Sequence, residues 1–342
     1  MKILVTGGAG FIGSSFVRCF MEKRQNPVVT LDSLTYAGNM ANLEAVLGLP
    51  RHTFVKGDIC DPSAVDFAMK GVGAVVHFAA ETHVDRSIDD SGIFLRTNVV
   101  GTGVLLDAAR RHNVKKFVHV STDEVYGAVL EGYSTEGGHL HPNSPYSASK
   151  AASDLLALSY HATYGLPVVV TRCSNNFGPY QFPEKLIPLF ISNALEDKPL
   201  PVYGDGLYVR DWIYVDDHSR AVDRVLWDGR AGEVYNIGGT KDKANLEITD
   251  FILNKLGKPA SLKKHVQDRP GHDRRYAMDS SKIEKELGWR AECNFEEALA
   301  QTIEWYRSNQ GWWRTIKSGE YRNYYEKFFA GRLAGSSAGS VN

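Results

Sequence analysis

The residues that could do chemistry gather in one short stretch, 121–127, which reads Ser-Thr-Asp-Glu-Val-Tyr-Gly. It follows the apolar run 117–120, which has the character of a buried strand. Catalytic groups of open α/β sheets gather just beyond the carboxyl ends of strands. Here that position holds the hydroxyl group of Thr122 and the adjacent carboxyl groups of Asp123 and Glu124. Solvated loop charges are the alternative interpretation, but the position at a strand end favours acid–base chemistry.

Tyr146 and Lys150 are the second part of the candidate site. They are four residues apart at the start of a predicted helix, so they share one helical face. A cation beside a phenol favours the phenolate, so we expect Lys150 to lower the pKa of Tyr146. A tyrosine with a lowered pKa can accept a proton near neutral pH. With the hydroxyl and carboxyl groups of the first stretch, this pair predicts a site for redox and acid–base chemistry.

The chain begins with a predicted strand, 2–5, a glycine-rich turn and a helix. Gly8, Gly10 and Gly13 fit the dinucleotide fingerprint, and Gly7, Gly10 and Gly13 fit its variant with wider spacing. Glycine permits the tight turn and lets backbone N–H groups approach a pyrophosphate at a helix N-terminus. A plain glycine-rich loop is the alternative, but the strand–turn–helix context is the one that the motif requires.

Three strand ends extend this predicted cofactor site. Asp32 follows the second strand, at the spacing after Gly13 where a carboxylate takes the ribose hydroxyls of a dinucleotide. A carboxylate there repels a 2′-phosphate, which favours NAD over NADP. Asp58, after the third strand, could bond the adenine amino group, although aspartate is also a common turn former. Small Ala79 and Ala80 follow the fourth strand and leave room for the cofactor.

The order of elements predicts an α/β fold with a parallel, doubly wound Rossmann sheet and a smaller C-terminal α/β domain that binds substrate. We expect a long helix from about 89 to 112, with Asn98 bonded to nearby backbone or water. We assign 1–172 and about 211–237 to the NAD-binding domain. The substrate-binding domain is then about 173–210 with 238–330, and 331–342, rich in Ser, Gly and Ala, is a flexible tail.

Composition narrows the class of protein. The 342 residues carry a formal net charge of −1, which favours neither nucleic acid nor an anionic membrane as a partner. No apolar run approaches a membrane span, and the N-terminus has the pattern of a strand, not of a signal peptide. His83 and Asp85 are close together, but no further ligand cluster supports a metal, so we expect them to order their loop. The cysteines have no metal or disulfide spacing, which is typical of small core residues in a reducing cytoplasm: Cys19, Cys60, Cys173 and Cys293.

The glycine turn, Tyr146, Lys150 and Thr122 resemble the extended short-chain dehydrogenase/reductase superfamily. Within it, the stretch 121–127 resembles the nucleotide-sugar 4,6-dehydratases, and those that act on dTDP-glucose above all. The resemblance runs from Met1 to about Lys327 and includes 79–87, 175–180, 183–188 and 269–276. The adjacent Asp–Glu pair is its specific part. Two departures are minor: Thr82 stands where Ser is usual, and Phe177 where Tyr is usual.

This resemblance implies a lyase that uses NAD and dTDP-glucose. Tyr146, held by Lys150, is expected to take the proton of the sugar 4-hydroxyl as C4 gives up hydride, while Thr122 bonds the 4-oxygen. Glu124 is expected to remove the C5 proton and Asp123 to protonate the departing 6-hydroxyl.

The resemblance also implies binding residues. The expected cofactor-binding residues are Gly7, Gly10, Phe11, Ile12, Gly13, Asp32, Asp58, Ile59, Ala79, Ala80, Thr97, Tyr146, Lys150 and Asn176. The expected sugar-nucleotide residues are Thr82, Asn175, Lys185, Leu186, Tyr203, Arg210, Asn245, Arg269 and His272. A homodimer is expected, in which the long helices near 89–112 and 146–163 form a four-helix bundle.

Two other functions fit part of this pattern. A sugar-nucleotide epimerase or decarboxylase on the same fold needs Tyr146 and NAD but no eliminating acid–base pair. A protein that only senses NAD(H) needs the glycine fingerprint alone, and gives no reason for Asp123, Glu124, Tyr146 and Lys150 to occur together. The nucleotide base and the pathway of the product stay open.

Overall fold

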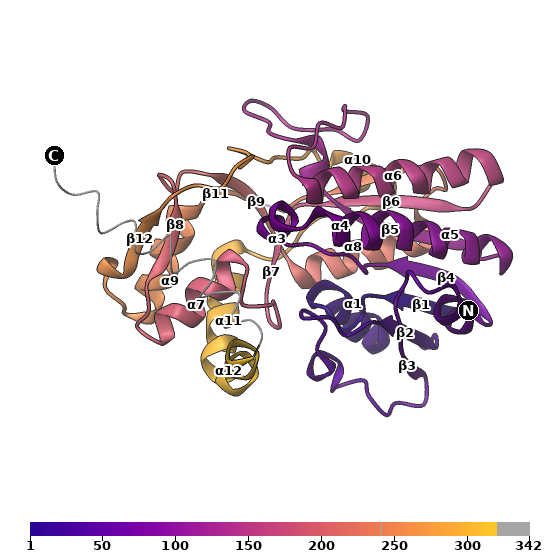
Figure 1. The fold of residues 1–342 in the computed structure, drawn as a ribbon, viewed down its shortest axis with the longest axis horizontal. Helices are drawn as coiled ribbons and strands as arrows, with labels where there is room; N and C mark the ends of the chain where they lie inside the picture. Colours follow the sequence, from indigo (N-terminus) through magenta and orange to yellow (C-terminus); the bar gives the residue numbers. More distant parts are fainter. Residues whose placement is uncertain (240, 320–342) are drawn as a thin grey trace.

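The computed structural model describes residues 1–239 and 241–319. The predicted tail, 331–342, lies outside the described residues. Two parts are visible in Figure 1: a large sheet with its helices, and a smaller α/β part formed mainly by later residues. Within the described ranges, no helix is both long enough and apolar enough to cross a membrane.

A seven-stranded parallel sheet forms the larger part, in the order β10-β6-β5-β4-β1-β2-β3. Its runs of Val, Ile and Leu are buried on both faces, as parallel sheets require. The chain turns from β3 back to β4 beside β1, so the strand order reverses between β1 and β4. Ligands of such sheets bind outside the carboxyl ends of the strands at this point. The strands are β1 (Lys2–Thr6), β2 (Val28–Asp32), β3 (His52–Lys56), β4 (Val72–His77), β5 (Lys116–Thr122), β6 (Val168–Cys173) and β10 (Val234–Ile237).

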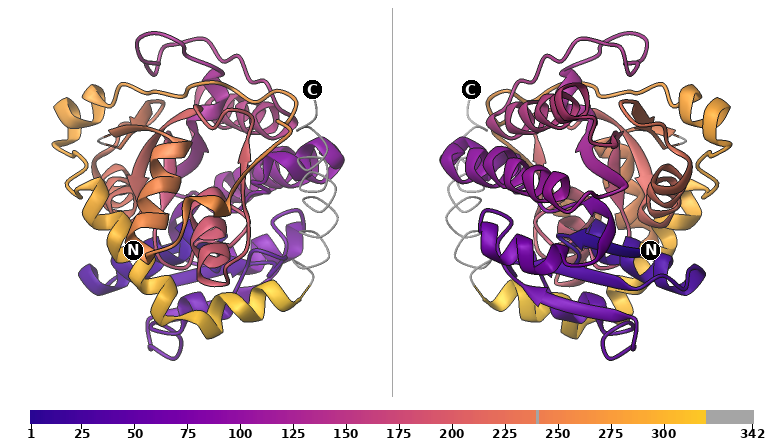
Figure 2. Two further views of the ribbon diagram at one scale, coloured as in Figure 1. Left: turned by 90° about the vertical axis from the view of Figure 1, so that its left-hand side faces the viewer. Right: turned by 90° about the vertical axis from the view of Figure 1, so that its right-hand side faces the viewer.

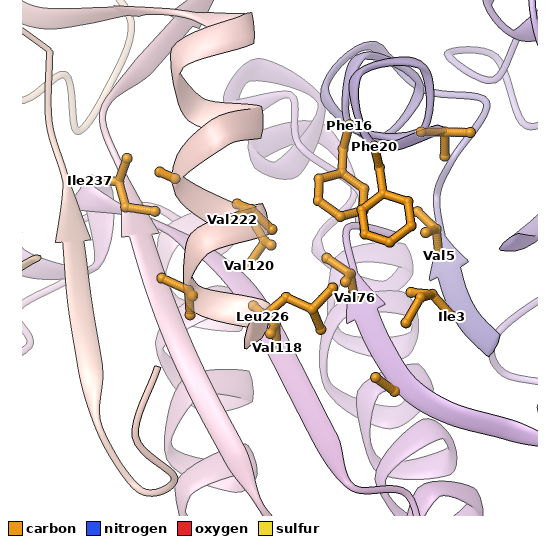
Figure 3. Close-up of a cluster of buried hydrophobic side chains, with 14 of the residues drawn as sticks. Ile3, Val5, Phe16, Phe20, Val76, Val118, Val120, Val222, Leu226 and Ile237 are labelled. Carbon is orange, nitrogen blue, oxygen red and sulfur yellow. The ribbon is translucent and has the colours of Figure 1, made fainter. Parts of the chain in front are cut away.

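Helices cover both faces of this sheet, which confirms the predicted doubly wound fold. On one face Phe16 and Phe20 of α1 (Phe11–Lys23) pack on the sheet beside Val222 and Leu226 of α8 (Val215–Asp228). Figure 3 shows these side chains above Val5, Val76 and Val118 of three neighbouring strands. Each fully buried side chain of this size contributes about 1.5–3 kcal/mol. The helices packed on the other face are α2 (Pro62–Met69), α5 (Thr102–Arg111) and α6 (Pro145–Tyr164).

The smaller part has its own apolar core around Phe190, Trp212, Leu299 and Trp313. Its three-stranded sheet has the order β11-β9-β7, and β8 pairs with β12 in parallel. This smaller part lies to the left of the central sheet in Figure 1 and faces the viewer in the left view of Figure 2. The elements are β7 (Asn175–Phe177), α7 (Leu186–Leu195), β8 (Leu200–Tyr203), β9 (Val209–Tyr214), β11 (Lys241–Ala244), α9 (Asn245–Leu256), β12 (Lys263–Val266), α11 (Phe295–Ser308) and α12 (Gln310–Ser318). The remaining elements of the molecule are η1 (Met40–Leu43), α3 (Val84–Asp89), α4 (Ser91–Phe94), η2 (Leu95–Gly101), η3 (Asp123–Tyr126), η4 (Ala260–Leu262) and α10 (Ser281–Leu287).

The predicted continuous helix from 89 to 112 is wrong in detail. Asp90 leaves the helical conformation and its side chain caps a new helix by accepting from the N–H of Gly92 at 2.9 Å. The next seven residues, η2, form a π-helix before α5 begins. Asn98 lies in that π-helix and bonds the backbone of Glu81 through both ends of its amide, as expected. π-Helical segments are frequent at functional sites, and this one borders the cleft described below.

Candidate active site

A cleft of about 340 Å³ lies at the carboxyl ends of β1, β4 and β5, within the size range of small-molecule sites. It extends from the glycine turn after β1 to the start of α7. All the expected cofactor and catalytic residues line it, with Thr82, Asn175 and Lys185 of the expected substrate residues. The structure therefore brings these dispersed residues together in one hollow.

The glycine turn has no space for side chains. Gly7 has a φ of +68°, and a Cβ there would lie 2.6 Å from the Cα of Ala79. A Cβ on Gly13 would lie 2.2 Å from the carbonyl oxygen of Gly7. Gly10 begins α1 without a side-chain cap, so the N–H groups of the first helical turn are left to a ligand. This end of the cleft fits a pyrophosphate group.

Asp32 is held at the rim of the same turn. Its Oδ2 accepts from the N–H of Ala9 at 2.9 Å, and its Oδ1 accepts from the N–H of Leu34 at 2.8 Å. Burial raises the pKa of this carboxyl, and the bonds from Leu34 and Ala9 oppose that rise. Each oxygen keeps a further lone pair for a ligand hydroxyl. Asp58 lines the cleft too, but its Oδ1 accepts from the N–H of Cys60 at 2.8 Å, so it also forms the turn.

The opposite wall holds the adjacent carboxyl groups. β5 ends at Thr122, whose hydroxyl oxygen accepts from the N–H of Glu124 at 3.3 Å and so begins η3. The same hydroxyl donates to Oδ1 of Asp123 at 3.1 Å. Asp123 is buried, and its Oδ2 has no hydrogen-bond partner among residues 1–239 and 241–319. A buried carboxyl with an unpaired oxygen favours the neutral form.

Glu124 lies in different surroundings from Asp123. Burial raises the pKa of both carboxyls, and that of Asp123 rises well above its usual range because the negative charge of Glu124 adds to burial. The cations of Arg269, Lys185 and Arg210 counteract the rise for Glu124. The two pKa values are therefore pushed apart, with Asp123 the better acid to keep protonated and Glu124 the better base.

Tyr146 and Lys150 enter the cleft from the first turns of α6. Ser144 caps this helix through a capping box with Ser147, and Pro145 occupies its first turn. The ammonium group of Lys150 donates to the carbonyl oxygen of Val120 at 2.8 Å, which holds it beneath the end of β5. Both side chains are buried.

The expectation that Lys150 lowers the pKa of Tyr146 is wrong. Burial raises the pKa of the phenol well above its usual range, and the negative charge of Glu124 adds to that rise. Burial also lowers the pKa of Lys150. Spacing along a helix indicates that two side chains are neighbours, but the depth of the site and the carboxyl groups opposite decide which form of the phenol is favoured.

The expected substrate residues form the far end of the site. The ammonium group of Lys185 donates to the carbonyl oxygen of Thr82 at 2.8 Å, which joins the start of α7 to the loop after β4. The hydroxyl of Tyr203 donates to Asp85 at 3.3 Å, and Arg269 lies 3.8 Å from the same carboxylate. Asp85 thus orders this region, as the sequence predicted for its loop.

Other expected substrate residues lie farther out, on β9, in 269–276 and at two helix starts. Arg210 is buried on β9, and His272 stacks on the ring of Tyr208 with 3.8 Å between ring centroids. Nδ1 of His272 lies 2.7 Å from the carboxylate of Asp268. Asn245 is the first residue of α9 and Leu186 is the first of α7. These residues do not line the cleft itself.

Sequence reasoning missed some of the residues that line the cleft. Glu184 is buried and accepts from Tyr36 at 3.1 Å and from Arg86 at 3.2 Å. The guanidinium carbon of Arg86 lies 3.9 Å from the ring centroid of Tyr36. Cys173, at the end of β6, also lines the wall. Their position beside the expected site residues was the only signal in the sequence.

Comparison with known proteins gives one consistent result. The family model described as GDP-mannose 4,6 dehydratase matches residues 4–302. The dTDP-glucose 4,6-dehydratase of Streptomyces niveus is 54% identical over 323 residues, which are 93% of this chain and 96% of that protein. DesIV, a dTDP-glucose 4,6-dehydratase from Streptomyces venezuelae solved with NAD bound, is 54% identical with a TM-score of 0.91, over 93% of this chain and 100% of that chain. A UDP-glucose 4-epimerase of Thermus thermophilus, solved in complex with NAD, is 31% identical with a TM-score of 0.83, over 90% of this chain and 100% of that chain.

Proposed function

Since this chain belongs to the dTDP-glucose 4,6-dehydratase family, we propose that it removes water from dTDP-glucose to give dTDP-4-keto-6-deoxyglucose. The observation that carries this proposal is the adjacent pair Asp123 and Glu124, which shares a cleft with Tyr146 and has two unlike electrostatic environments. The experiment is incubation of the purified protein with dTDP-glucose and identification of the product by NMR. A 4-keto-6-deoxy sugar is expected, and a C4 epimer would refute the proposal.

The residues that line the cleft fit NAD. The first turn of α1, with Phe11 and Ile12, would hold the pyrophosphate, and Asp32 would hold the ribose hydroxyls of the adenosine. When bound, NAD would supply a positively charged group that accepts hydride from C4 of the sugar and later returns it to C6. Thr97 and Asn176 would form the rest of the cofactor site, and the small side chains of Ala79 and Ala80 would leave room for the cofactor.

Asp32 predicts a preference for NAD over NADP. Its carboxylate, held by the N–H of Ala9, would accept hydrogen bonds from the ribose hydroxyls and would repel a 2′-phosphate. NADP should therefore bind at least about 10-fold more weakly, a free-energy difference of about 1.4 kcal/mol. Calorimetry on cofactor-stripped protein measures both affinities. Equal or tighter binding of NADP would contradict the assignment of Asp32.

Oxidation at C4 is assigned to the wall formed by β5 and α6. Tyr146 takes the proton of the 4-hydroxyl as hydride leaves C4, and Thr122 bonds the 4-oxygen. Lys150, fixed by its bond to the carbonyl of Val120, places a cation beneath the same wall. The resulting 4-ketone makes the C5 hydrogen acidic, which prepares the elimination.

Elimination is assigned to the adjacent carboxyl groups. Glu124 removes the C5 proton, and Asp123 gives a proton to the 6-hydroxyl, which leaves as water. Hydride then returns to C6 and a proton to C5, so the cofactor ends the cycle unchanged. The electrostatics support this division, because Glu124 faces three cations and Asp123 is the more strongly neutralised group.

These two pKa shifts predict a bell-shaped dependence of kcat/KM on pH. The base must be ionised, so activity should fall as pH drops through a pKa above the ordinary 4.5 of a glutamate. The acid must be protonated, so activity should fall again as pH rises through the pKa of Asp123, which lies well above the ordinary 3.8 of an aspartate. Initial rates across the pH range, compared between wild type and Asp123→Asn, measure this. An alkaline limb that is unchanged in Asp123→Asn would contradict the role of Asp123.

The proposal also assigns the cofactor and the substrate to different parts of the molecule. Residues 1–172 with about 211–237 would hold NAD. Residues of about 173–210 with 238–330 would hold most of the sugar nucleotide. Guanidinium groups bind phosphates bidentately, so arginines in this second part suit a diphosphate. The proposed substrate-binding residues are Thr82, Asn175, Lys185, Leu186, Tyr203, Arg210, Asn245, Arg269 and His272.

We also propose a cytoplasmic homodimer. Apolar side chains on η2 and α6 are exposed, with Leu95, Val100 and Leu155 each more than half accessible. Two copies that pack these helices together would cover them in a four-helix bundle, which sedimentation of the purified chain would test. The four cysteines are free thiols, which suits a reducing compartment.

A further inference from the structure

Asp273 is a buried carboxylate between the two parts of the molecule, in the stretch 269–276. It is 7% exposed, its carboxylate accepts two hydrogen bonds, and its backbone carbonyl accepts a third. None of the roles described above uses it. Buried carboxylates of this kind need strong partners, so what Asp273 binds indicates what it does.

One partner belongs to the start of the catalytic helix. The side-chain amide of Asn143 donates to Oδ1 of Asp273 at 2.6 Å. Asn143 directly precedes Ser144, the cap of α6, and Tyr146 follows two residues later. The backbones also meet at this point, because a Cβ on Gly271 would lie 2.8 Å from the carbonyl oxygen of Asn143. Asp273 therefore fixes the end of α6 that carries the phenol.

The other partners face the carboxyl groups of the site. The hydroxyl of Tyr276 donates to Oδ2 of Asp273 at 2.6 Å, and a guanidinium nitrogen of Arg210 donates to its carbonyl oxygen at 2.8 Å. The guanidinium carbon of Arg210 also lies 4.3 Å from the ring centroid of Tyr276. Arg210 and Tyr276 both interact electrostatically with Glu124. Through its carbonyl oxygen and through Tyr276, Asp273 thus holds Arg210, a cation that lowers the pKa of Glu124, whereas the negative charge of Asp273 itself raises that pKa.

The chain between the catalytic stretch and α6 follows the same segment. The N–H of Val129 donates to the carbonyl of Arg275 at 3.0 Å, and the N–H of Ser134 donates to that of Ala277 at 2.9 Å. The guanidinium of Arg275 donates back to the carbonyl oxygen of Gly132 at 2.8 Å. The segment between the catalytic stretch and α6 is therefore hydrogen-bonded to residues 275–277, and Asp273 lies where that segment enters α6.

We propose that Asp273 is a positioning residue, which fixes the start of α6, and with it Tyr146, relative to Arg210 and the base Glu124. This rests on the proposed function only in the roles given to Tyr146 and Glu124. The oxidising group and the eliminating group come from different strand ends and helices. The carboxylate of Asp273 binds Asn143 on one side and Tyr276, whose ring packs on Arg210, on the other, so this residue sets the distance between the two neighbourhoods. Small displacements at such sites cost as much as about 100-fold in rate.

Asn143→Ala tests the link to the helix, because Asn143 is exposed and its loss does not threaten folding. We expect NADH formation in a single turnover with dTDP-glucose to slow by about 10- to 100-fold, while the dissociation constant of dTDP changes by less than about 3-fold. Asn294→Ala is the matched control. It removes an amide that caps α11, far along the chain from the site, and should leave the rate unchanged.

A double-mutant cycle separates positioning from a general loss of stability. Asp273→Ala should slow NADH formation at least as much as Asn143→Ala, and the double variant should be no slower than Asp273→Ala alone. If Asp273→Ala fails to fold, Tyr276→Phe takes its place in the cycle. The loss of rate in Asn143→Ala combined with Tyr276→Phe should then be smaller than the product of the losses in the two single variants. Asn143→Ala at the wild-type rate, or fully multiplicative losses, would overturn the proposal. NADH formation reports C4 oxidation alone, so it tests Asp273 even if no water is eliminated, whereas absence of the keto sugar in wild type refutes only the function.

Discussion

Glu124→Gln is expected to allow oxidation of the sugar at C4 and then to stop the reaction. Tyr146, Lys150 and Thr122 are untouched, so the first hydride transfer proceeds. An amide cannot accept the C5 proton, so elimination should fall by about 10²–10⁴-fold. The variant should therefore accumulate NADH and the 4-keto sugar, which absorbance and mass spectrometry measure. Exchange of the C5 hydrogen with deuterated water should be lost to the same degree.

Two companion variants make this result specific. Asp123→Asn should slow departure of the 6-hydroxyl, because an amide is a far weaker acid, yet leave C5 exchange in place. Glu304→Gln makes the same chemical change at an exposed glutamate of α11 and should be silent. Dehydration by Glu124→Gln at a near-normal rate would show that Glu124 is not the base.

Tyr146→Phe should abolish oxidation at C4 while it leaves folding and NAD binding largely intact. The substitution removes one oxygen from a helix start that Ser144 and Ser147 already cap, so the structural cost is small. With no group to take the hydroxyl proton, NADH formation in a single turnover should fall by about 10²–10⁴-fold.

Tyr164→Phe is the matched control for that variant. It removes the same oxygen from the far end of the same helix, where Tyr164 is 55% exposed. NADH formation in this control should equal the wild-type rate. If Tyr146→Phe also forms NADH normally, another group accepts the proton and the role of Tyr146 is wrong.

Sequence patterns predicted the central sheet well, because its strands are short apolar runs bounded by glycine, proline and polar residues. They also located Asp32 and the pair Asp123 and Glu124, since parallel strands bring their carboxyl ends to one edge. The division of roles within the pair rested on resemblance alone. Its physical support required coordinates, because Lys185, Arg210 and Arg269 reach Glu124 from distant parts of the chain.

Features that depend on tertiary contacts were not predictable in this way. The charged segment β11 pairs with β9, and its sequence has no apolar alternation to indicate a strand. α12 was missed, although Trp313 buries its ring in the smaller core and Trp312 donates to Asn42 at 3.1 Å. The π-helix η2 and the raised pKa of Tyr146 likewise arise from neighbours that sequence spacing does not reveal.

In the proposed reaction this protein oxidises the sugar and then eliminates water across C5 and C6. Wild-type turnover of dTDP-glucose in deuterated water tests it most directly, with the product analysed by NMR. We expect a 4-keto-6-deoxy sugar that carries deuterium at C5, because the C5 proton is removed and later replaced from solvent. A product that keeps its 6-hydroxyl and differs from the substrate only at C4 would contradict it.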